Sequence, residues 1–259
     1  MIVKVKNGAY EQYEQLLLQR DHYRKAAGQF LIAYTREFGD RINEVFEKKI
    51  ECIRLKKTIA ACQVFINRGE TIDVDAMNER IRKEMVRYYA QLEEMLDETR
   101  TAKEGTQVPM AIDIEIRRIY RRLAKMLHPD INPMTSTLTQ LMDIWNRVCI
   151  AYHSNNMEEL RDLEVLARSA LEQIGAGDIS IEIPDIEDRI ERLEREIGEV
   201  LTTEPYTYRY LLADPEQVEE KKASLDAEFR EYEAYRQSLE KTLDAILIES
   251  GRTLTWRMR

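Results

Sequence analysis

Three long stretches of the sequence repeat an apolar residue every three or four positions. One runs from Leu16 to Ile59, one from Met77 to Met95 and one from Val218 to Ile246. This period places the apolar side chains on one face of an α-helix. Only 9 of the 259 residues are glycine and 6 are proline, while 34% are charged, a composition typical of long solvated helices. The sequence therefore predicts an all-α fold.

Each apolar stripe needs a covering partner, because a helix buries only the face that another element contacts. The break at residues 67–72 is short, which favours an antiparallel, coiled-coil-like pairing of the two helices beside it. Gly39-Asp40 either ends one helix and caps the next or lies inside a kinked continuous helix, since the stripe passes through it in phase. The stripes can pair within one chain or between two chains, so the oligomeric state stays open.

The positions of the breaks divide the chain into three consecutive segments. These are an N-terminal long-helix region at 1–107, a central helical unit at 108–176 and a C-terminal helical hairpin at 177–259. Residues 179–184 alternate apolar and polar side chains, which predicts a short extended connector. Asp73 and Asp214 are expected N-caps, and Pro215 suits the first position of the last helix.

Composition and charge exclude several classes of function. The net charge of -9 argues against a general nucleic-acid binder, which needs a basic surface to displace counterions. We find neither an apolar run of the roughly 20 residues that a membrane span requires nor a signal peptide. Cys52, Cys62 and Cys149 are odd in number and contain no CxxC pair, which argues against disulfides and structural zinc. We expect a cytoplasmic protein with buried free cysteines.

The tripeptide His128-Pro129-Asp130 follows a helical run at 111–127. Pro129 disfavours helical geometry at the residue before it, so the helix ends there and we expect His128 and Asp130 to be exposed on a loop. Catalysis would need a nucleophile or a second base nearby, and none is visible. A metal site would need more ligands, but His22 and His153 are remote in sequence. We therefore predict no enzyme activity, no cofactor and no metal. Recognition of a partner is the role that remains for this loop.

The helix before His128 carries a cluster of basic residues. They are Arg117, Arg118, Arg121, Arg122 and Lys125. Like charges four residues apart repel each other and destabilise a helix. A cluster kept despite this cost favours an acidic partner surface, which the basic face would attract. The alternative is an ordinary solvated face.

The residues around this tripeptide resemble a known family. Tyr120-Arg121-Arg122-Leu123-Ala124, followed by His128-Pro129-Asp130 and Asn132-Pro133, resembles helix II and the loop of a J-domain, the module of DnaJ-type cochaperones. Trp145, Val148 and Ala151-Tyr152 resemble the matching positions of the family's helix III. The resemblance covers roughly residues 111–166. It implies a helical hairpin whose core contains Tyr120, Leu123, Leu127, Trp145, Val148 and Tyr152.

The resemblance also implies a function. Such a hairpin docks on a DnaK-type heat-shock chaperone and stimulates its ATPase, while the J-protein itself hydrolyses nothing. By that analogy His128, Pro129 and Asp130 carry the stimulation. Arg117, Arg118, Arg121, Arg122 and Lys125 bind the acidic face of the chaperone.

This sequence departs from the family pattern in several ways. The family's short helix I, with its Tyr-x-x-Leu-Gly pattern, is not recognisable before Pro109, and residues from the helix at 73–104 are one candidate to pack in its place. Met126 occupies a position that is often basic. The chain has neither a Gly/Phe-rich linker nor a cysteine-rich zinc module. We therefore expect a specialised member whose helical arms select a client or partner. The alternative is a coiled-coil scaffold with a non-functional J-like hairpin.

Overall fold

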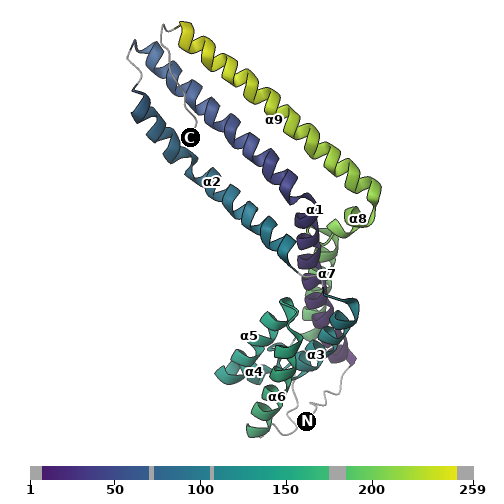
Figure 1. Cartoon of the computed structure of the whole chain (residues 1–259). Helices are drawn as coiled ribbons and strands as arrows, with labels where there is room; N and C mark the ends of the chain where they lie inside the picture. Colours follow the sequence, from purple (N-terminus) through teal and green to yellow (C-terminus); the bar gives the residue numbers. More distant parts are fainter. Residues whose placement is uncertain (1–7, 70–72, 106–107, 175–184, 250–259) are drawn as a thin grey trace. The chain divides into compact units, whose positions relative to one another are not determined.

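The structure is a computed structural model that describes residues 8–69, 73–105, 108–174 and 185–249. Every regular element in these ranges is a helix, so the predicted all-α fold is confirmed (Figure 1). The helices are α1 (Gly8–Asn67), α2 (Val74–Glu104), α3 (Met110–Leu127), α4 (Pro133–Thr137), α5 (Thr139–His153), α6 (Met157–Gln173), α7 (Ile186–Thr202), α8 (Tyr208–Ala213) and α9 (Pro215–Glu249). The connector predicted at 179–184 lies outside the described residues.

The chain forms two compact units, each built from segments that are far apart in the sequence. The first unit combines Met1–Phe30 with Thr106–Thr207, and the second combines Leu31–Gly105 with Tyr208–Arg259. These units do not coincide with the consecutive segments 1–107, 108–176 and 177–259. The difference arises because α1 is a single helix of 60 residues, whose first part belongs to one unit and whose remainder belongs to the other.

Helix α1 continues through Gly39-Asp40, which decides between the two alternatives left open for this dipeptide. Gly39 is buried against α2. A Cβ atom added there would lie 2.6 Å from Oγ1 of Thr99. The amide of Asn43, one turn later, donates a 3.0 Å hydrogen bond to the same Oγ1. The glycine therefore serves the close approach of α1 and α2.

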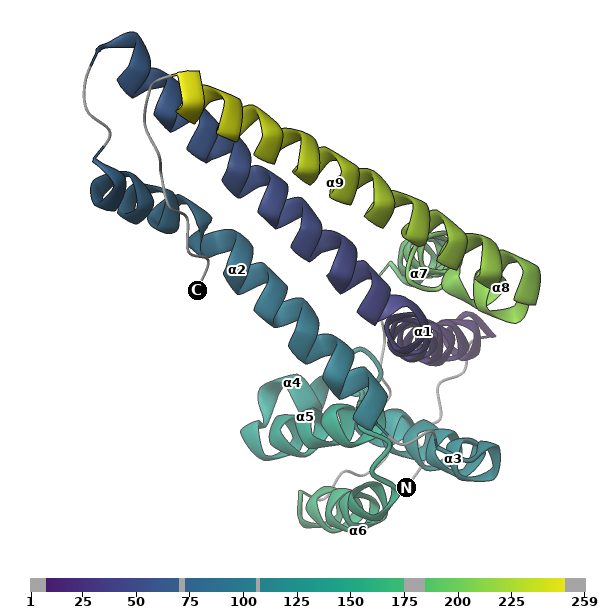
Figure 2. The ribbon, with the colours of Figure 1, turned by 45° about the horizontal axis from the view of Figure 1, so that its top comes forward.

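In the second unit, α2 and α9 lie along the two sides of α1 (Figure 2). Apolar side chains from all three helices form its main core: Ile50, Cys62, Met77, Ile81, Met85, Leu243 and Leu247. Asp73 caps α2 by accepting a 3.0 Å hydrogen bond from the backbone of Ala76, and Asp214 accepts one from Glu216 next to Pro215. Both predicted N-caps are confirmed. The stripes thus cover one another within the chain.

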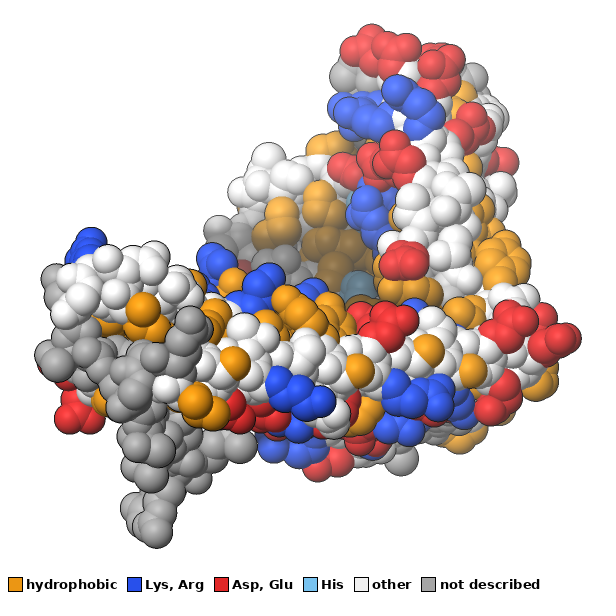
Figure 3. Space-filling model, turned by 90° about the horizontal axis from the view of Figure 1, so that it is seen from above, with side chains coloured by type: hydrophobic (Ala, Val, Ile, Leu, Met, Phe, Trp, Pro, Cys, Tyr) orange, Lys and Arg blue, Asp and Glu red, His pale blue; other side chains and the backbone are white. Residues whose placement is uncertain are grey.

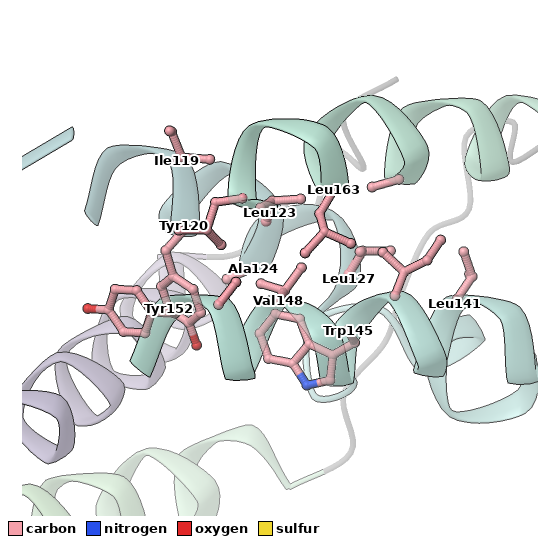
Figure 4. Close-up of a cluster of buried hydrophobic side chains, with 14 of the residues drawn as sticks. Ile119, Tyr120, Leu123, Ala124, Leu127, Leu141, Trp145, Val148, Tyr152 and Leu163 are labelled. Atoms are coloured by element: carbon pink, nitrogen blue, oxygen red, sulfur yellow. The ribbon is translucent and has the colours of Figure 1, made fainter. Parts of the chain in front are cut away.

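In the first unit, α3, α5 and α6 enclose a common apolar core (Figure 4). All six side chains expected in the hairpin core are buried in it: Tyr120, Leu123, Leu127, Trp145, Val148 and Tyr152. A second cluster joins the beginning of α1 to α7 and to the loop after α3, through Tyr10, Tyr13, Leu17, Ile131, Ile190 and Leu193. The hairpin is therefore packed against α6 and, at its turn, against α1.

The surface is mixed in charge. On the face shown in Figure 3, acidic and basic side chains are interspersed, with small groups of hydrophobic side chains between them. Within the described residues, no helix combines the length and the hydropathy that crossing a membrane requires. Cys52 and Cys62 are buried and Cys149 is half-buried, and all three thiols are free.

Candidate partner-binding site

The loop after α3 is held by its own hydrogen bonds. The backbone of His128 is extended, with φ -61° and ψ 125°, as expected for a residue before proline. Its carbonyl accepts hydrogen bonds from the backbone of Ile131 at 2.8 Å and of Asn132 at 2.7 Å. The Asn132 side chain caps α4 and donates a 2.8 Å hydrogen bond back to the carbonyl of Met126. Pro129 thus ends α3 where the sequence predicted.

The side chain of His128 lies inside the first unit. Only 6% of the residue is exposed, and its ring lies 5.0 Å from the ring of Trp145 in an edge-on arrangement. The prediction that His128 is exposed is therefore wrong. Sequence reasoning placed it correctly at a helix end, but the side chains that cover this end come from a distant part of the chain. Asp130 keeps 44% of its side chain exposed.

The hydrogen bonds of His128 define its protonation. Its Nδ1 accepts a 3.1 Å hydrogen bond from the backbone N–H of Asp130, so a neutral ring carries its proton on Nε2. Nε2 lies 3.9 Å from a carboxylate oxygen of Asp21. Burial lowers the pKa of His128 below its ordinary value, while Asp21 and Asp130 act in the opposite direction. The ring is therefore neutral at pH 7 and directs an N–H towards Asp21.

Asp21 also binds the hairpin through Tyr120. The Tyr120 hydroxyl donates a 2.7 Å hydrogen bond to Asp21, and its ring stacks on that of Tyr152 with centroids 3.8 Å apart. Burial, followed by the charge of Asp21, raises the pKa of Tyr120. One carboxylate of α1 therefore contacts both the aromatic core of the hairpin and the histidine of its loop.

Two of the five basic residues of α3 pair within their own helix. Arg117 forms an ion pair with Asp113 and lies 3.4 Å from the ring of His22. Arg118 lies 3.1 Å from Glu115, with 67% of its side chain exposed. Because Asp113 and Glu115 lie one turn earlier, these pairs follow from the sequence spacing. They reduce the net positive charge of the basic face.

Two other basic residues pair with different helices. Arg122 donates two 2.8 Å hydrogen bonds to Glu164 of α6, and Lys125 lies 2.5 Å from Glu14 of α1. The bidentate pair holds the pKa of Glu164 at about 2. Arg121 is exposed and has no acidic partner within ion-pair distance among the described residues. Sequence reasoning missed Glu14, Asp21 and Glu164, since no local pattern links them to α3.

A buried lysine lies farther along the contact between α1 and the hairpin, beyond Asp21. Lys25 of α1 is 4% exposed. Its Nζ lies 3.6 Å from Asp113 and 4.0 Å from the centre of the Tyr152 ring. Burial lowers the pKa of Lys25, and Asp113 counteracts this effect. Nζ makes no hydrogen bond, and neither does Nδ1 of the adjacent His22. This part of α1 is thus held by an ion pair and a cation–π contact.

Among the residues that the structure describes, no three His, Cys, Asp or Glu side chains are grouped so that they could hold a metal ion. Comparison of the chain with protein-family models, with curated proteins and with solved structures returns no match. The J-domain resemblance therefore rests on the residues and on the hairpin that carries them.

Proposed function

We propose that this protein is a J-domain-type cochaperone, which binds a DnaK-type chaperone and stimulates its ATPase. The observation that carries the proposal is the hairpin of α3 and α5, with His128-Pro129-Asp130 at its turn and five basic residues on α3. The tripeptide and its neighbours resemble the family motif. Their side chains pack in one core, in which Trp145 contacts both His128 and Tyr120.

The roles of the residues follow from their chemistry. Arg121, and the exposed part of Arg118, offer charge to an acidic chaperone surface. Pro129 and Asp130 form the accessible tip of the loop, with His128 behind them. The guanidinium groups of these arginines suit the binding of an acidic surface, because they bind carboxylates with two parallel hydrogen bonds. The cochaperone needs no cofactor of its own, because the chaperone holds the nucleotide.

The second unit provides the arms of the proposed cochaperone. Its helices expose separate apolar side chains, among them Val86, Tyr89 and Leu96 on α2. We assign to this unit the selection of a protein client or of a site of action. A cytoplasmic location, where DnaK-type chaperones meet their clients, is part of the proposal.

The alternative is a scaffold protein whose hairpin has only a structural role. The burial of His128 and the ion pairs of Arg122 and Lys125 favour this alternative. In this arrangement little of the motif is free to contact a chaperone. The two proposals differ in what a change at His128 does. A scaffold tolerates His128→Gln and a cochaperone does not.

The test is the steady-state ATPase of the DnaK-type chaperone from the same organism, titrated with the full-length protein. We expect wild-type protein to raise the rate several-fold and His128→Gln to remove most of that increase. His153→Gln is the matched control, because His153 is exposed on α5 and lies outside the motif. A chaperone that does not respond to the wild type at any concentration rules the proposal out. Equal responses to wild type and His128→Gln favour the scaffold.

A further inference from the structure

We infer that Tyr10–Lys25 of α1, hereafter the cover segment, is an intramolecular competitor for Lys125 and His128, and that a partner binds these two residues only when this segment leaves. The inference rests on the proposed function, because both residues belong to the proposed partner-binding site. It adds a regulatory contact that the resemblance to J-domains does not supply.

The cover segment contacts the hairpin at four levels. The Tyr10 hydroxyl donates to the carbonyl of Ile131 at 3.4 Å, Glu14 pairs with Lys125, Asp21 accepts from Tyr120, and Lys25 pairs with Asp113. As the residue number rises in α1, that of its partner falls, so the two helices run antiparallel here. The four α1 residues are spaced by four, seven and four positions, which places them on one helix face.

The chemistry of the cover segment resembles that of the partner it would exclude. The basic face is expected to receive carboxylates from a chaperone. In this structure Glu14 already supplies a carboxylate to Lys125, and Asp21 supplies one on the Nε2 side of His128. Two carboxylates cannot occupy one position beside His128. Intramolecular binding and partner binding at these residues are therefore mutually exclusive.

The cover segment is held by apolar and polar contacts. Tyr10, Tyr13 and Leu17 are buried in the cluster with Ile131, Ile190 and Leu193, and Leu18 packs against the hairpin core. The layer beside α3 also holds three nitrogen atoms that are buried without a hydrogen bond: Nζ of Lys25, Nδ1 of His22 and Nε of Arg117. Buried polar groups without hydrogen bonds carry a desolvation cost that exposure to water removes. This cost lowers the free energy needed to open the contact, as is typical of segments that move.

Hydrogen exchange with and without the chaperone tests the inference directly. We expect peptides from residues 8–25 to exchange faster when the full-length protein is saturated with chaperone and ATP, while peptides from the core of α6 do not change. Binding and stimulation without faster exchange at 8–25 would overturn the inference about the cover segment and leave the proposed function standing. The absence of both binding and stimulation would overturn the proposed function, and with it the inference about the cover segment.

A charge reversal gives an independent test. Glu14→Lys places a cation beside Lys125, so the closed state is weakened and a larger fraction of the protein is competent to bind. We expect half-maximal ATPase stimulation at about a threefold lower concentration than for wild type. Glu11→Lys is the matched control, because Glu11 is exposed on the same helix and the substitution changes the net charge equally. Circular dichroism verifies that both variants fold. Equal concentrations for half-maximal stimulation in Glu14→Lys, Glu11→Lys and the wild type would overturn the inference about the cover segment.

Discussion

The hydroxyl of Tyr120 donates a 2.7 Å hydrogen bond to the carboxylate of Asp21, which lies 99 residues earlier in the chain. The same carboxylate lies 3.9 Å from Nε2 of His128. A residue of α1 thus reaches two of the hairpin positions that carry the family resemblance. In our proposal, the state of this contact decides whether His128 is available to a partner.

We predict that Asp21→Asn lowers the pKa of His128 further. Burial already lowers it from 6.5, and the charge of Asp21 acts against burial, so its removal leaves the protonated ring less stabilised. Titration of the His128 ring by NMR measures the change. Asp143→Asn is the control, because Asp143 is exposed on α5. A His128 pKa that rises in Asp21→Asn would show that the carboxylate is not beside the ring.

The same shift has a consequence for stability. The folded state holds His128 neutral below pH 6.5, where the ring of the unfolded chain takes up a proton. The contribution of the neutral ring to stability is therefore complete above pH 6.5 and falls as the pH drops towards the folded-state pKa.

Acid should weaken the link between α3 and α6. Arg122 holds the pKa of Glu164 at about 2, against an ordinary value of 4.5. The contribution is complete above pH 4.5 and is lost as the pH falls towards 2. We expect Glu164→Gln to lower the free energy of unfolding by about 1–2 kcal/mol at pH 7, allowing for solvent screening. The deficit should shrink by pH 3 in urea unfolding. Glu172→Gln, an exposed change on the same helix, should cost less than about 0.5 kcal/mol at either pH.

Gly39→Ala should destabilise the second unit. The new Cβ would lie 2.6 Å from Oγ1 and 2.8 Å from Cγ2 of buried Thr99, so the helices must shift, at about 1–3 kcal/mol. Thermal and urea unfolding measure this cost. Gly28→Ala is the control, because nothing lies within 4 Å of its Cβ position and alanine favours a helix by about 1 kcal/mol. The double variant Gly39→Ala/Thr99→Ala should recover part of the loss. An unchanged stability for Gly39→Ala would contradict the close approach.

Local signals predicted much of the fold. The three- and four-residue period of α3 identified Leu123 and Leu127 as core residues, and both are buried. Pro129 predicted the end of α3, and Asp73 predicted the start of α2. These predictions succeed because helix periodicity and capping depend on residues within one or two turns of each other.

The sequence by itself determined the long helices, the caps at Asp73 and Asp214, the end of α3 and the side chains of the hairpin core. It left open whether α1 continues through Gly39-Asp40, and it did not predict the short helices α4 and α8. Only the tertiary structure decided which helix covers the loop after α3. The basic run of α3 looked like a free surface, yet Lys125 and Arg122 find acids on α1 and α6, and His128 is buried beside Asp21. The reason is physical. A spacing of three or four residues states that a face will be covered, but the residue that covers it can lie a hundred positions away, and long-range packing alone selects it.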